Sequence, residues 1–134
     1  MRIVLDANVA IAGAISRGLC EAVVELCLEH HQLVTCKALN NEIETKLIHK
    51  IRIPKPVVAE FMAVLKGNAL SFEPASIDKS VCRDPNDVMI LGLVQPGQVE
   101  VIITGDNDLL VLKQYQGAKI MTPRGFWEIC KGQT

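Results

Sequence analysis

The chain has 134 residues, of which 49% are hydrophobic and 22% are charged, and its formal net charge is −1. This length suits one domain with a substantial core and not two, and the composition excludes an intrinsically disordered protein. No apolar run approaches the ~20 residues of a transmembrane helix, and the first ten residues, MRIVLDANVA, lack the features of a secretory signal.

The apolar patterning predicts short strands that alternate with helices. Ser16 is a plausible N-cap for the first helix, and Leu39, Ile43 and Leu47 recur at four-residue steps in the second, which is therefore amphipathic. The expected elements are, in chain order, a strand at 2–5, a helix at 20–31, a strand at 32–35, helices at 38–51 and 57–67, a weaker strand at 69–72, a helix at 84–94, a strand at 98–104, a short helix at 107–115, an edge strand at 118–122 and a terminal helix at 123–131.

Helices that alternate with short, almost uniformly apolar strands indicate an α/β fold. We expect a single domain over residues 1–134, with a parallel sheet covered on both faces, which makes a three-layer α/β/α arrangement. Sheets of this kind bind ligands outside the carboxyl ends of their strands, where the chain order reverses. The polar residues that follow each strand are therefore the first candidates for function.

Six carboxylates lie directly after predicted strands or in the first turns of predicted helices. Each has an ordinary explanation, because Asp at a helix start caps it and Glu42 lies four residues before Lys46, where an ion pair forms. Several carboxylates at one sheet edge would, however, repel one another unless a cation compensates them. Oxygen ligands suit Mg²⁺ or Mn²⁺, and the chemistry that follows is metal-assisted phosphodiester hydrolysis. The six are Asp6, Glu42, Asp84, Asp87, Asp106 and Asp108.

The densest basic stretch is KLIHKIRIPK, residues 46–55. It is either a solvated helix face followed by a loop or a surface that faces phosphate, and the sequence leaves both open. Setting five carboxylates of one pocket aside leaves ten acids against fourteen cations, which is compatible with a nucleic-acid substrate. Five cysteines without a CxxC pair indicate reduced thiols, so we expect a cytoplasmic protein.

The segments LDANV, NEIETKL, RDPNDVMIL, IITGDNDLL and IMTPRGFWEI, in this order, resemble a PIN domain. Among PIN domains the chain is most similar to the toxin components of prokaryotic toxin–antitoxin pairs, over Ile3 to about Ile129. The resemblance implies a parallel sheet of four to five strands and an endoribonuclease that uses Mg²⁺ or Mn²⁺ to cut RNA. It also implies an antitoxin that covers the acidic cleft, and a homodimer, for which the apolar helices at 57–67 and 84–94 are candidates.

The resemblance also implies roles for individual residues. The four acids of the family match Asp6, Glu42, Asp87 and Asp106, which are the expected catalytic residues and metal ligands. Asp108 matches a further acid beside the fourth, as a neighbour or a ligand of a second metal. The supporting positions are Asn8 and Thr104, which match polar residues that orient the ligands, Arg83 and Lys46, which are candidate phosphate contacts, and Asp84, which is expected to cap a helix and not to bind metal.

The chain departs from the family pattern at two places without losing an acid. Ala7 stands where Thr is common, and Cys36 and Lys37 stand where a Ser-Pro pair is usual. Glu44 could exchange roles with Glu42 after a register error, although the two side chains would point about 200° apart on a helix.

Three further interpretations compete with the nuclease. A strand ending in Asp and a GDND segment are also similar to haloacid-dehalogenase-type phosphatases, but these need an aspartate where Asn8 stands. A response-regulator receiver would need an Asp after its middle strand, where ALSFEP offers none. The third interpretation is a metal-free PIN-like interaction module, and the complete set of acids counts against it because uncompensated buried charge is costly.

Overall fold

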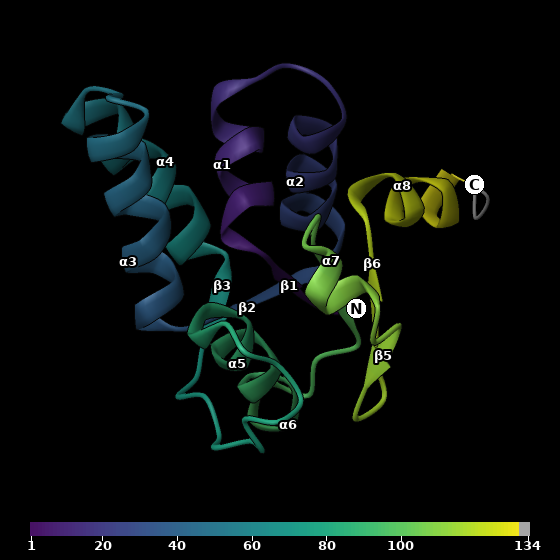
Figure 1. Ribbon diagram of the computed structural model, residues 1–134. Helices are drawn as coiled ribbons and strands as arrows, with labels where there is room; N and C mark the ends of the chain where they lie inside the picture. Colours follow the sequence, from purple (N-terminus) through teal and green to yellow (C-terminus); the bar gives the residue numbers. More distant parts are fainter. Residues whose placement is uncertain (132–134) are drawn as a thin grey trace.

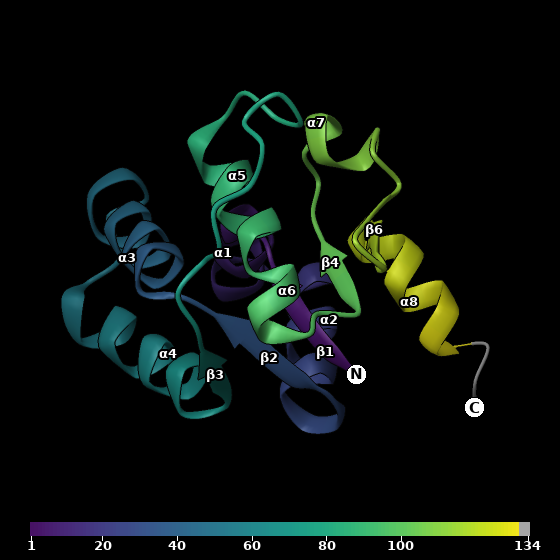
Figure 2. The ribbon, with the colours of Figure 1, turned by 90° about the horizontal axis from the view of Figure 1, so that it is seen from below.

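The central sheet carries helices on both faces, as Figure 1 shows for the computed structural model, which describes residues 1–131. One face is covered by helices α1 (Ala7–Ile15), α2 (Leu19–His30) and α8 (Pro123–Lys131), with α3 (Lys37–Thr45) and α4 (Lys55–Gly67) beside them at one end of the sheet. Helices α5 (Pro85–Gly92) and α6 (Val94–Gly97) lie on the other face (Figure 2). The expected three-layer α/β fold is confirmed.

Within residues 1–131 the sheet has six strands and not the expected four to five. They are β1 (Arg2–Leu5), β2 (Gln32–Thr35), β3 (Ala69–Ser71), β4 (Val101–Ile103), β5 (Gln114–Tyr115) and β6 (Ala118–Met121), in the order β3-β2-β1-β4-β6-β5. All neighbours are parallel except β5 and β6, which pair antiparallel. The chain moves outward from β1 to β2 and β3, then returns to the other side of β1 with β4, so its order reverses between β1 and β4.

The expected edge strand at 118–122 is not an edge, because β5 covers β6. A tight turn through Gln116 and Gly117 joins the two strands, and both residues have a positive φ, of 47° and 89°. This conformation is typical of two-residue hairpin turns. A strand of two residues is too short to show an alternating pattern, so the sequence at 107–115 was assigned to a helix. That helix, α7 (Asn107–Leu110), ends before β5 begins.

No helix was expected where α1 lies, and the expectation that Ser16 is the N-cap of the next helix is wrong. Ser16 is the C-cap of α1, where its backbone N–H and its hydroxyl both donate to Ala12 O, at 3.0 and 2.5 Å, and α2 begins after Gly18 instead. Helix α1 is almost entirely apolar, so it shows no amphipathic period. Its small residues allow α2 to approach closely, because a Cβ on Gly13 would lie 2.7 Å from Val24 Cγ2.

Two other helices differ in their ends from the predicted ones. The expected helix at 38–51 is α3 followed by one turn of π-helix at Lys46–Lys50, which carries the first half of the basic stretch. Helix α4 begins at Lys55, with Pro56 inside its first turn, where a missing N–H costs no hydrogen bond.

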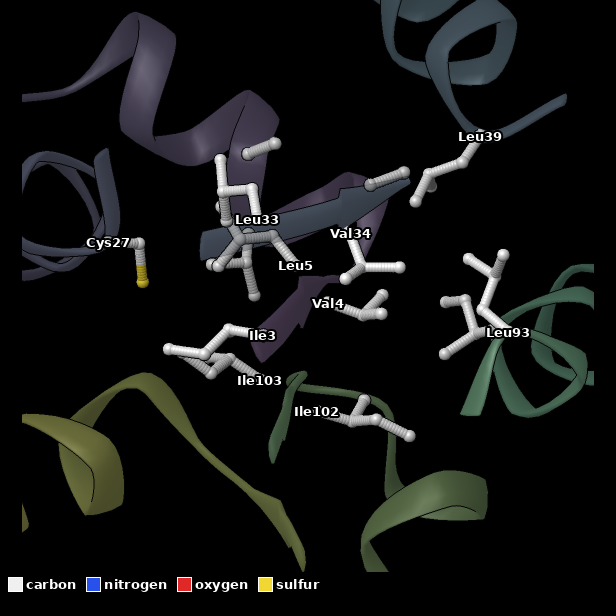
Figure 3. Close-up of a cluster of buried hydrophobic side chains, with 14 of the residues drawn as sticks. Ile3, Val4, Leu5, Cys27, Leu33, Val34, Leu39, Leu93, Ile102 and Ile103 are labelled. Carbon is white, nitrogen blue, oxygen red and sulfur yellow. The ribbon is translucent and has the colours of Figure 1, made fainter. Parts of the chain in front are cut away.

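The two central strands form the middle of the core (Figure 3). Ile3 and Val4 of β1 and Ile102 and Ile103 of β4 are fully buried, on both faces of the sheet, as expected for parallel strands between helices. Leu5 is level with Ile103, and the next residue continues the ladder, because its N–H donates to Ile103 O at 2.9 Å. The segments that follow β1 and β4 therefore start side by side. Within the described residues, no helix has the length and apolar character needed to cross a membrane.

Candidate metal centre

Asp6 and Thr104 lie at the ends of the two central strands and are hydrogen bonded to each other. Thr104 is fully buried and donates from Oγ1 to Asp6 Oδ2 at 2.6 Å, and Asp6 is itself only 7% exposed. The same Oγ1 accepts from the backbone N–H of Asp106 at 3.0 Å. The buried hydroxyl of Thr104 therefore fixes both the carboxylate of Asp6 and the backbone of Asp106.

Three further carboxylates converge from the starts of α5 and α7. Asp84 caps α5 by accepting from Asn86 N at 2.9 Å, and Asp106 caps α7 by accepting from Asp108 N at 2.9 Å. One oxygen each of Asp84, Asp87 and Asp106 lies within 4.8 Å of the other two. Asp84 was expected only as a cap, and the structure makes it a candidate ligand as well. Asp84 and Asp87 lie one helical turn apart, and this spacing could have indicated their common direction.

Glu42 approaches from the second turn of α3 and has one oxygen without a partner. Its Oε1 atom is buried and accepts no hydrogen bond within residues 1–131, while Lys46 Nζ lies 3.9 Å away, beyond hydrogen-bonding distance. Burial raises the pKa of Glu42, Lys46 lowers it, and the charges of Asp6 and Asp84 raise it further. Glu42 therefore belongs electrostatically to the same group of acids (Figure 2 shows α3 and α5 at this end of the molecule).

Asp87 is the most perturbed acid of the group. It is 3% exposed, and burial is the largest cause that raises its pKa to about 7. Its interaction with Asp106 raises the pKa further, while the Cys82 thiol, which donates to Asp87 Oδ2 at 3.5 Å, lowers it. Without a cation, a substantial fraction of the Asp87 carboxyl groups therefore carries a proton near neutral pH.

These residues fit a divalent cation. The donors are carboxylate oxygens, three of them lie within reach of one ion, and Glu42 contributes a buried oxygen that lacks a partner. Mg²⁺ and Mn²⁺ prefer such ligands, and their charge would offset the repulsion among the acids. A bound divalent cation would therefore favour the ionised form of each buried carboxylate.

The other expected site residues lie at the rim. Asn8 and Arg83 are exposed, and their side chains make no hydrogen bond or ion pair with any described residue. Asp108 is exposed in the first turn of α7, two residues after Asp106, and is not part of the cluster of Asp84, Asp87 and Asp106. Lys46 contacts Glu42 as described above. Cys82 is not among the predicted site residues, because nothing in its sequence spacing distinguishes it from a cysteine of the core.

The raised pKa of Asp87 predicts a dependence of stability on pH in metal-free protein. The folded pKa of about 7 exceeds the unfolded value of 3.8, so the folded state holds an extra proton between these limits. The contribution of Asp87 to the free energy of unfolding is thus greatest below about pH 4, falls through pH 7 and is constant above, with a slope on the order of 1 kcal/mol per pH unit. Urea unfolding in EDTA, with Asp87→Asn as the reference, measures this difference. A wild-type protein that gains stability relative to the variant as pH rises from 5 to 7 would contradict it.

The sequence model of the PIN domain family matches residues 2–108. The chain belongs to the PIN domain family. The match spans the Asp6, Glu42, Asp87 and Asp106 segments of this PIN domain and favours the expected family over the phosphatase and receiver alternatives.

A comparison with solved structures supports the fold of the PIN domain. It superposes on a chain of the crystal structure of VapBC2 from Rickettsia felis bound to a DNA fragment from their promoter, with a TM-score of 0.62. The alignment covers 91% of this chain and 98% of that chain at 11% sequence identity, so the similarity is one of fold. A comparison with curated proteins gives no match.

Proposed function

We propose that this PIN domain is a divalent-metal-dependent endoribonuclease that hydrolyses phosphodiester bonds of RNA. The observation that carries the proposal is the cluster of Asp84, Asp87 and Asp106, with one carboxylate oxygen of each within 4.8 Å of the others, beside which Glu42 is subject to the charges of Asp6 and Asp84. PIN domains are generally nucleases, which agrees with this chemistry. A metal-free interaction module would gain nothing from the buried, mutually repelling acids.

In this proposal Asp6, Glu42, Asp87 and Asp106 hold Mg²⁺ or Mn²⁺, with Asp84 and Asp108 beside them. The bound ion would supply a more acidic water and offset the charge that develops on the phosphate. Thr104 would position a metal ligand, because its hydroxyl holds the Asp6 carboxylate in one orientation.

Two cations at the rim are suited to bind the RNA backbone. Lys46 lies against Glu42 and remains half-exposed, so its ammonium can also meet a phosphate. Arg83 directly precedes Asp84 and has no partner among residues 1–131, which leaves its guanidinium free to bind a phosphate oxygen. We assign both the role of phosphate contacts.

We further propose that the protein is the cytoplasmic toxin of a toxin–antitoxin pair. The support is its sequence resemblance to PIN toxins and its fold similarity to a chain of VapBC2. An antitoxin would cover the acidic cleft, since a cationic side chain such as arginine could neutralise it. Of the two helices expected to form a homodimer face, α4 exposes Val57 (52%) and Val64 (49%), whereas the large apolar side chains of α5 are buried or half-buried. We therefore place the dimer face on α4.

Chelation tests the proposed function directly. The purified protein is expected to cleave a labelled single-stranded RNA in Mn²⁺ or Mg²⁺, and EDTA should abolish cleavage, because the acids alone provide no activated water. Calorimetry on the same preparation should show binding of Mn²⁺. Cleavage that persists in EDTA, or a folded protein that binds no divalent ion, would refute the nuclease.

A further inference from the structure

A groove lies outside the acid group, between the start of α3, the edge strand β3 and the segment after it. It consists of two adjoining pockets of about 480 and 330 Å³ that share Lys37, Asn41 and Ser71 as lining residues. Figure 1 shows the start of α3 beside β2 and β3, where the groove runs. This volume is in the range of pockets that bind small organic ligands, on the order of 300 to 1,000 Å³.

Most polar side chains of this groove make no hydrogen bond or ion pair within residues 1–131. Lys37, Asn41, Lys66 and Ser71 are exposed, and none of their side chains makes a hydrogen bond or an ion pair with another residue of 1–131. Asn40 accepts from Thr35 Oγ1 at 2.8 Å through Oδ1, and its amide N–H groups have no acceptor in the described part of the chain. Two cations and several donors are therefore free to meet a ligand.

The two ends of the groove differ in chemistry. Lys66 lines one pocket and Lys37 lines both, so positive charge lies at one end and in the middle. The other end is formed by Phe72, Glu73 and Pro74, which supply an aromatic ring, a single carboxylate and an apolar wall. A phosphate matches the lysines, whereas a nucleobase matches the ring and the carboxylate, which accepts hydrogen bonds from exocyclic amino groups.

The groove also borders the acid group. Asn41 of the groove directly precedes Glu42, and Cys36 lines the groove at the end of β2. Cys36 is the N-cap residue of α3 and Glu42 lies in the second turn of the same helix, so the groove and Glu42 occupy adjoining parts of α3. A strand of RNA bound at the acid group can therefore extend into the groove.

We propose that this groove binds a nucleotide that flanks the scissile bond of a single-stranded RNA, with its phosphate against Lys37 and Lys66 and its base against Phe72 and Glu73. The proposal rests on the ribonuclease function proposed above and adds a binding subsite to it. It assigns base preference to Glu73, which selects a base with an amino group over uracil.

Fluorescence anisotropy with labelled hexamers of cytidine and of uridine tests the subsite. The full-length chain carries Asp87→Asn and the buffer contains EDTA, so binding is measured without cleavage. Lys37→Ala and Lys66→Ala should each weaken binding of both oligomers about 3- to 10-fold and lower the slope of log affinity against log salt by about 0.7. Glu73→Gln should remove a preference for cytidine over uridine of about threefold or more, since it removes the charged acceptor.

Lys119→Ala is the matched control, because Lys119 is an exposed lysine on β6, on the far side of the sheet from β3. It should change affinity less than twofold, Lys37→Arg should retain binding, and circular dichroism melts should show that all variants fold. Lysine variants that bind as the reference does, or a reference with no preference between the oligomers, would overturn the subsite. Cleavage by the unmutated chain in Mn²⁺ separates the two proposals: cleavage with no effect of the lysines leaves only the nuclease, and lysine-dependent binding without cleavage leaves only the groove.

Discussion

Asp87→Asn is expected to reduce RNA cleavage by about 10³-fold or more and, at the same time, to stabilise the metal-free protein. The loss follows because an amide cannot supply the negative charge that holds a divalent cation. The gain follows because Asp87 is buried beside Asp106, and at pH 8 its charged form is unfavourable, which is why its pKa is raised to about 7. An uncharged amide of the same shape removes this cost, on the order of 1 to 3 kcal/mol.

Initial rates on labelled RNA in Mn²⁺ and urea unfolding in EDTA at pH 8 measure the two effects. Glu25→Gln is the matched control, because it makes the same chemical change at an exposed position on α2 and should alter neither quantity. An Asp87→Asn variant that cleaves at the wild-type rate would contradict the nuclease. One that loses stability in EDTA would instead show that Asp87 is stabilised by its neighbours, against the geometry described above.

Ile102→Ala is expected to lower the free energy of unfolding by about 3 to 4 kcal/mol. Ile102 is fully buried in β4, between β1 and β6, and its side chain packs in the cluster of Figure 3. Its truncation removes apolar contacts and leaves a cavity that rigid neighbouring strands cannot close. For a domain of this size the melting temperature should fall by roughly 10 to 15 °C.

Calorimetric or fluorescence-detected melting of the two proteins checks this prediction. Val111→Ala provides the comparison, because Val111 is 72% exposed and its truncation should cost less than about 0.5 kcal/mol. A loss below about 1 kcal/mol for Ile102→Ala would mean that the centre of the sheet repacks more readily than close packing allows.

The sequence predicted the fold where the pattern was long and regular. Strand β2 and helix α8 lie where they were expected, and the apolar runs of β1 and β4 correctly indicated a parallel sheet between two helical layers. Helix α1 was not predicted because its residues are nearly all apolar, so its sequence lacks the alternation of apolar and polar faces that marks an amphipathic helix. The hairpin of β5 and β6 was not predicted, because a strand of two residues is too short to show an alternating pattern.

The sequence predicted at which edge of the sheet the candidate site lies, but not how its side chains are arranged. The topological rule for parallel sheets indicated that Asp6 and Asp106 would meet, and they are now linked through Thr104. The spacing of Asp84 and Asp87 is compatible with a common direction, but it did not distinguish a simple helix cap from a cap that is also a candidate metal ligand, because both are the same residue type at the same position. Nor did it indicate the Cys82 thiol against Asp87, because that contact depends on the path of the segment before α5.

The two carboxylates that begin α5 and α7 serve the protein even in the absence of chemistry. Asp84 and Asp106 each accept a backbone hydrogen bond at a helix start, a contact worth about 1 kcal/mol, whereas Glu42 and Asp87 are acids that burial makes costly to ionise. On the proposed ribonuclease function, a descendant that had lost this activity would be free to replace Glu42 and Asp87, and selection for folding alone would retain Asp84 and Asp106. In related sequences, Asp84 and Asp106 would thus be retained for the fold alone, whereas retention of Glu42 and Asp87 would indicate that the proposed activity is kept.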